Sequence, residues 1–220
     1  MNRHPRLRFV LVVTIAAVGA IVSAASVNFQ STYKSASAAG VSFFGKKVAA
    51  LVIHKDESMR MSAEESLARE LTALGMQGIA TYRIAPKEEM QDADRAKTWF
   101  QKTGVEGVVI LRPVNVSKRQ VYTSSVWVSG YYNTFWGYYG YGWSQVYVPG
   151  GTETETTMVI ENTIYSVPRN ELLWAAVVDT TDPKNLQKLV ADIVKATVKE
   201  MQKQGLAKKP GKLDALDLQK

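Results

Sequence analysis

The sequence predicts an α/β protein with a single layered domain, and an α+β arrangement is the alternative. In the first half of the chain, short apolar runs rich in Val and Ile alternate with longer amphipathic stretches, which is the pattern of a β-α-β-α-β unit. Two β-prone runs around a turn then predict a hairpin, and a last amphipathic stretch predicts a C-terminal helix. With 220 residues, the chain is long enough to bury a core of its own.

The predicted domain covers residues 46–206, and its first half contains three strands and two helices. Asp56 and Ser58 are candidate caps of the first helix, and Gly75 is expected to end it. Gly104 is expected to end the second helix in the same way. The expected strands are residues 47–54, 77–84 and 105–116, and the helices are the stretch between Asp56 and Gly75 and residues 92–102.

The second half of the domain is richer in β-prone residues. Pro168 and Asn170 mark the turn of the hairpin, and Asp182 followed by Pro183 is a typical helix start. Beyond this helix, the charged C-terminal residues are expected to be disordered. The expected elements are a strand at 121–128, hairpin strands at 152–167 and 171–180, a helix from 182 to about 204, and a charged tail at 207–220.

The N-terminus carries the signs of export. Arg3, Arg6 and Arg8 precede an uncharged apolar run, which ends in small residues at Ala24. This layout predicts a signal peptide at residues 1–24, and the alternative is an N-terminal anchor in the inner membrane. Both place the domain outside the cytoplasm, in the periplasm or on the periplasmic face of the outer membrane. Residues 25–45 are rich in Ser, Ala and Gly and are expected to be a flexible linker.

Composition excludes several chemistries. Cysteine is absent and histidine occurs twice, so cysteine nucleophiles, cysteine metal sites and a cysteine-linked lipid are excluded, and we expect no metal and no cofactor. The net charge of +7 is partly due to the three arginines of the signal segment. Because an exported protein meets no free nucleic acid, we expect no nucleic-acid partner.

Candidate catalytic residues are few. His54 would be the only histidine left after cleavage, and the chain has no G-x-S-x-G motif to support a serine nucleophile. Glu153, Glu155 and Glu161 occupy alternate positions of one β-prone run, so they could share a face. A pair of carboxylates could serve a hydrolase, whereas a solvated strand face carries glutamates without any catalytic role. We therefore expect no enzymatic activity, with a carboxylate-dependent envelope hydrolase as an alternative.

The aromatic segment, residues 131–143 within the Tyr/Gly-rich insert 129–150, is the most unusual feature. Its glycines interrupt both helical and strand periods, so a long loop is expected, and deleting it should leave the fold intact. Tyr and Trp offer large, rigid contact areas with a polar tip, which favours a contact surface. The alternative is a loop that folds back on its own sheet. The candidate contact residues are Tyr131, Tyr132, Phe135, Trp136, Tyr138, Tyr139, Tyr141 and Trp143.

In the order of these sequence segments, the chain resembles a group of uncharacterised bacterial envelope proteins that are often lipoproteins. The resemblance rests on residues 46–84, 104–116, the Tyr/Gly-rich insert, the hairpin and the last helix. At the level of fold, the β-α-β-α-β start is similar to the amino-terminal domain of TolB and to the curli-secretion lipoprotein family. The sequence around Ala24 lacks the lipid-bearing cysteine of a lipoprotein. The group offers no catalytic residues to carry over.

Together, these observations predict a non-enzymatic, exported accessory or interaction protein of the cell envelope. Its partner would be an envelope protein, a glycan or a membrane surface that meets the aromatic segment. The alternative is a saccharide or small-ligand binding module in which Trp136 and Trp143 form the platform.

Overall fold

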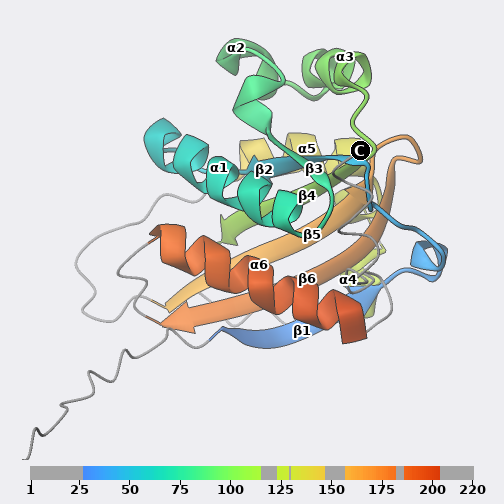
Figure 1. The fold of residues 1–220 in the computed structure, drawn as a ribbon, viewed down its shortest axis with the longest axis vertical. Helices are drawn as coiled ribbons and strands as arrows, with labels where there is room; N and C mark the ends of the chain where they lie inside the picture. Colours follow the sequence, from blue (N-terminus) through green and yellow to red (C-terminus); the bar gives the residue numbers. More distant parts are fainter. Residues whose placement is uncertain (1–26, 115–122, 129, 147–156, 182–185, 204–220) are drawn as a thin grey trace, which may run out of the picture.

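The computed structural model describes residues 27–114, 123–128, 130–146, 157–181 and 186–203 (Figure 1). The expected signal segment and the expected charged tail lie outside these residues, and so does the start of the last helix at Asp182. Within the described part of the chain, no helix is both long and apolar enough to cross a membrane.

A mixed six-stranded sheet forms the centre of the molecule, which confirms the α/β prediction. The strands lie in the order β1-β6-β5-β4-β2-β3. β2, β3 and β4 are parallel to one another, whereas β5, β6 and β1 extend the sheet in antiparallel pairs. The bounds are Asn28–Lys34 for β1, Lys47–Val52 for β2, Gln77–Ala80 for β3, Gly107–Val114 for β4, Thr157–Ser166 for β5 and Glu171–Thr181 for β6.

Helices cover both faces of the sheet, so the domain has three layers. α1 and α6 lie side by side over one face (Figure 1). α3, α5 and the short elements around them cover the other face. The helices are α1 (Glu57–Ala73), α2 (Lys87–Met90), α3 (Ala93–Thr103), α4 (Ser124–Trp127), α5 (Phe135–Ser144) and α6 (Leu186–Lys203), and the 3₁₀ turns are η1 (Ala36–Ala38), η2 (Thr81–Arg83) and η3 (Gly130–Asn133).

The sheet separates two hydrophobic cores of different composition. In β2, Val48 and Ala50 face the core under α1 and α6, which is built mainly from aliphatic side chains. Ala49, Leu51 and Ile53 face the opposite core, to which α3, η3 and α5 contribute many aromatic rings. Because successive side chains of a strand point to opposite faces, an uninterrupted apolar run such as β2 can serve both cores.

The predicted helix boundaries of the first half are confirmed. The Asp56 carboxylate accepts a hydrogen bond from the Met59 backbone N–H at 2.9 Å and caps α1. Gly75 and Gly104 follow α1 and α3 with φ of 81° and 69°, in the left-handed region that favours glycine.

Three expectations about the backbone are wrong. The strand expected at 77–84 ends at Ala80, and residues 81–83 form η2. Residues 28–34, expected to belong to a flexible linker, form β1, which pairs with the edge of β6. The ring of Phe29 meets Trp174 of β6 edge-on at 6.5 Å, so the segment gains both backbone pairing and an apolar contact. Residues 124–127 form α4 and not a strand, because Trp127 turns into the aromatic core and is 1% exposed.

Candidate functional site

The aromatic segment forms a helix that divides its eight aromatic residues into a buried and an outward set. α5 presents one side to the sheet at helical spacing, and η3 contributes one more ring to that side. The buried residues are Tyr132, Phe135, Tyr138 and Tyr139; the outward residues are Tyr131, which is 39% exposed, and the half-buried Trp136, Tyr141 and Trp143. Trp136 and Trp143 also pack against the aromatic core with part of their rings. The expectation of a loop with eight contact residues is therefore wrong, because four of them are core.

The glycines of the segment allow this packing. A Cβ atom at Gly142 would lie 2.5 Å from Cδ1 of Ile53, so the glycine lets α5 pack against the end of β2 without a shift of the buried Ile53 side chain. The Thr134 hydroxyl accepts the Gly137 backbone N–H at 3.2 Å and caps the helix. Deleting 131–143 would remove part of the core, and we now expect this deletion to unfold the domain.

A buried polar cluster lies beneath α5. Arg112 of β4 and Glu161 of β5 are directly opposite in the strand register, and Arg112 Nε and Nη2 donate to Glu161 Oε2 at 2.9 and 2.6 Å. The Tyr132 and Tyr138 hydroxyls donate to the same carboxylate at 2.7 and 2.8 Å. Arg112 is 3% exposed and Glu161 is 0% exposed. The cluster thus joins α5 and η3 to the sheet and is closed to substrates.

Two causes raise the pKa of the tyrosines in this cluster. Burial raises the pKa of Tyr132 and of Tyr138, and the negative charge of Glu161 raises both further. These hydroxyls therefore stay protonated and act as hydrogen-bond donors. The expectation that Glu161 lies on a solvated strand face is wrong, and Glu153 and Glu155 lie outside the described residues.

On one flank of α5, two tyrosines form a rigid outward pair. The rings of Tyr131 and Tyr141 are stacked, with centroids 3.6 Å apart and an interplanar angle of 13°. The guanidinium carbon of Arg112 lies 4.9 Å from the centre of the Tyr141 ring, so a buried cation supports the pair from below. Burial and the hydrogen bond to Tyr141 raise the pKa of Tyr131 to about 12.

On the other flank, Trp136 lines a pocket. This pocket has a volume of about 510 Å³ and lies between α3, α5 and the turn of the β5–β6 hairpin. The Trp136 backbone N–H donates to Oδ1 of Asn170 in that turn at 3.1 Å. Trp143 is not among the lining residues of the pocket.

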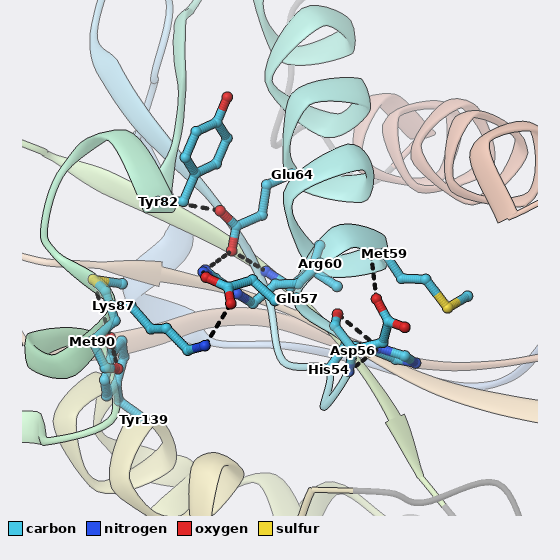
Figure 2. Close-up of polar contacts among 11 residues, drawn as sticks. His54, Asp56, Glu57, Met59, Arg60, Glu64, Tyr82, Lys87, Met90 and Tyr139 are labelled. Carbon is cyan, nitrogen blue, oxygen red and sulfur yellow. Dashed lines mark hydrogen bonds and ion pairs between the residues drawn. The ribbon is translucent and has the colours of Figure 1, made fainter.

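A second polar network lies where the parallel strands end (Figure 2). Glu64 of α1 is 0% exposed, and its carboxylate accepts hydrogen bonds from Arg60 Nη1 at 3.0 Å and from the backbone N–H groups of Val52 and Tyr82 at 3.3 and 2.9 Å. Burial raises the pKa of Glu64, and the charge of Arg60 opposes this. The carboxylate thereby fastens α1 to β2 and η2.

This network continues to the surface through charged side chains. Lys87 Nζ lies 2.5 Å from Glu57 Oε2, and Glu57 Oε1 lies 4.0 Å from Arg60 (Figure 2). His54 is half-buried, and its Nδ1 accepts the Asp56 backbone N–H at 3.0 Å. The ring thus takes part in the turn that leads into α1, and no group of three or more His, Cys, Asp or Glu within the described ranges could hold a metal ion.

Sequence reasoning missed both buried Arg–Glu pairs, although each leaves a signal. Arg60 and Glu64 are four residues apart on a helix, which is the spacing of an ion pair. Arg112 lies within the otherwise apolar run of β4. A charged residue in a strand that is buried on both faces requires a partner.

No family model matches the chain, and no curated protein matches it. Among solved structures, the chain is similar to two crystal structures of the PelC dodecamer from Paraburkholderia phytofirmans. The first, of a variant, has 15% identity and a TM-score of 0.41 and covers 78% of this chain and 94% of that chain. The second has 14% identity and a TM-score of 0.39 and covers 77% and 91%. A likeness of this degree carries no information on function.

Proposed function

We propose that this chain is a non-enzymatic, exported protein of the cell envelope that binds an envelope partner through the outward side chains of the aromatic segment. The apolar N-terminal run behind three arginines supports export. The observation that carries the binding role is the rigid outward tyrosine pair, Tyr131 and Tyr141. Rings that are held in place before binding lose little conformational entropy when a partner covers them.

The surroundings of the pair support this role. Tyr131 is one of the few large hydrophobic side chains that the described residues leave exposed, and Val128, at 47% exposure, lies close to it along the chain. The inner half of the same segment is fixed by Phe135, Tyr138 and Tyr139, which are 0% exposed. The segment therefore combines a fixed base with an aromatic outer surface. The hydrolase alternative has one candidate carboxylate fewer, because Glu161 is fully buried and no substrate can reach it.

Site-specific photocrosslinking in cells tests this proposal. A photoreactive phenylalanine analogue is placed at position 131, and in a matched control at position 59, because Tyr131 and Met59 have the same exposed fraction of 39%. We expect a discrete adduct with an envelope component from position 131 only. Equal adducts from both positions, or none from position 131, would contradict the proposed binding surface.

A further inference from the structure

The pocket beside Trp136 joins an aromatic wall to polar side chains. Its volume of about 510 Å³ falls within the range of small-molecule binding sites. Lys97 and Gln101 enter from α3, Glu106 comes from the segment before β4, and Pro168 and Asn170 belong to the hairpin turn. These residues are far apart in sequence, so the pocket exists only in the folded chain.

The indole of Trp136 is held in place before any ligand arrives. The Phe100 ring meets it edge-on at 5.6 Å, and the Phe135 ring lies 4.5 Å away. The hydrogen bond from its backbone to Asn170 ties this part of α5 to the hairpin turn. Asn170 itself has φ of 49°, a left-handed conformation that asparagine tolerates better than most residues.

The polar side chains of the pocket differ in whether they already have a partner within the protein. Lys97 and Gln101 are one helical turn apart on α3 and exposed, and within the described part of the chain neither side chain forms a hydrogen bond or ion pair. The Glu106 carboxylate already pairs with Lys46 Nζ at 3.1 Å. Among Lys97, Gln101 and Glu106, the side chains without a partner in the described residues are therefore an amide and a positive charge, and the charge of Glu106 is compensated by Lys46.

We infer that this pocket binds the pyranose ring of a neutral or acidic glycan. A pyranose has a face of C–H groups, which packs on an indole, and an edge of hydroxyls, which bonds to amide and ammonium groups. The pocket offers both next to each other, while Lys97 disfavours a cationic sugar. This inference rests on the proposed binding role of the aromatic segment and names a ligand class for its Trp136 flank.

NMR titration of the ¹⁵N-labelled full chain tests the inference directly. The chain has five tryptophans, and the indole N–H signal of Trp136 is assigned by its absence in Trp136→Phe. The probes are cellotetraose as a neutral glycan, tetragalacturonate as an acidic glycan and the chitosan tetramer as a cationic glycan. We expect saturable shifts of the Trp136 signal with the first two probes and none with the third.

Variants then separate the pocket from the rest of the segment. Trp136→Ala and Gln101→Ala are expected to weaken binding about tenfold or more. The control is Trp99→Ala, which also removes a half-buried tryptophan but does not touch the pocket lining, and it should bind like the wild type. Lys97→Ala should weaken tetragalacturonate binding more than cellotetraose binding.

Two outcomes would overturn the inference: a Trp136 signal that no glycan moves, or equal losses of binding in Trp136→Ala and Trp99→Ala. If the adduct at position 131 still forms in either case, the glycan inference alone fails. If that adduct is missing as well, the proposed function fails with it.

Discussion

The two buried Arg–Glu pairs of this protein have the same chemistry, but one pair forms within a single helix and the other forms between two strands. Arg60 and Glu64 lie one turn apart on α1, so the helix alone brings them together. Arg112 and Glu161 lie on different strands and meet only when β4 and β5 pair in the correct register. The local pair uses its spare oxygen lone pairs on backbone N–H groups, whereas the cross-strand pair uses tyrosine hydroxyls from another layer. The first pair therefore fastens one helix to the backbone of β2 and η2, and the second joins the side chains of four elements, β4, β5, η3 and α5.

The largest expected effect comes from breaking the cross-strand pair. Arg112→Ala leaves Glu161 buried without its cation and should lower the free energy of unfolding by about 3–5 kcal/mol. Equilibrium unfolding in urea measures the loss. The double variant Arg112→Met with Glu161→Gln removes both charges and keeps a carbonyl acceptor for the tyrosines, so it should be more stable than Arg112→Ala. A double variant that is less stable than the single variant would contradict a buried ion pair.

The hydroxyl of Tyr138 should contribute the next largest amount. Tyr138→Phe removes a hydrogen bond to a buried carboxylate and should cost about 1.5–3 kcal/mol in urea unfolding. Tyr141→Phe is the control from the outward side of the same helix, where a surface change should stay within about 0.5 kcal/mol. Equal losses in the two variants would show that the hydroxyl of Tyr138 has no special role.

Glycine substitutions in α5 test the close packing that brings the tyrosines of the cross-strand pair onto the sheet. Gly142→Ala places a methyl group 2.5 Å from Ile53 Cδ1 and should cost about 1–3 kcal/mol by overpacking. Gly140→Ala is the matched control, since its Cβ would meet nothing closer than Ala93 Cβ at 3.8 Å; it should gain up to about 1 kcal/mol from better helix propensity. Thermal unfolding of both variants shows whether each substitution raises or lowers the stability. A stabilised Gly142→Ala would mean that α5 does not need to lie so close to β2.

The same contrast between local and distant contacts explains what the sequence could predict. Asp56, Gly75 and Gly104 act on their own helix ends, so their roles were predicted correctly. β1 was missed because its partner β6 lies far along the chain and its own residues look like a linker. α5 was missed because its glycines hid the helical spacing of Phe135, Tyr138 and Tyr139, and the close approach of Gly142 to Ile53 is visible only in the folded chain. The pocket beside Trp136 likewise needs the hairpin turn in place before it exists.

The smallest expected effect is the change of stability with pH that comes from Glu64 in the local pair. Burial raises the pKa of Glu64 above its usual 4.5, so the folded state holds this proton more tightly than the unfolded state. The free energy of unfolding therefore falls as the pH rises above that value, because ionising the carboxylate is harder in the folded protein. In Glu64→Gln, the side chain at position 64 is uncharged at every pH, so this fall in the free energy of unfolding is absent. Urea unfolding from about pH 4 to about pH 7 should show the wild type losing stability relative to Glu64→Gln. A wild type that gains stability relative to the variant over this range would mean that Arg60 and the two backbone N–H groups outweigh burial in setting the pKa of Glu64.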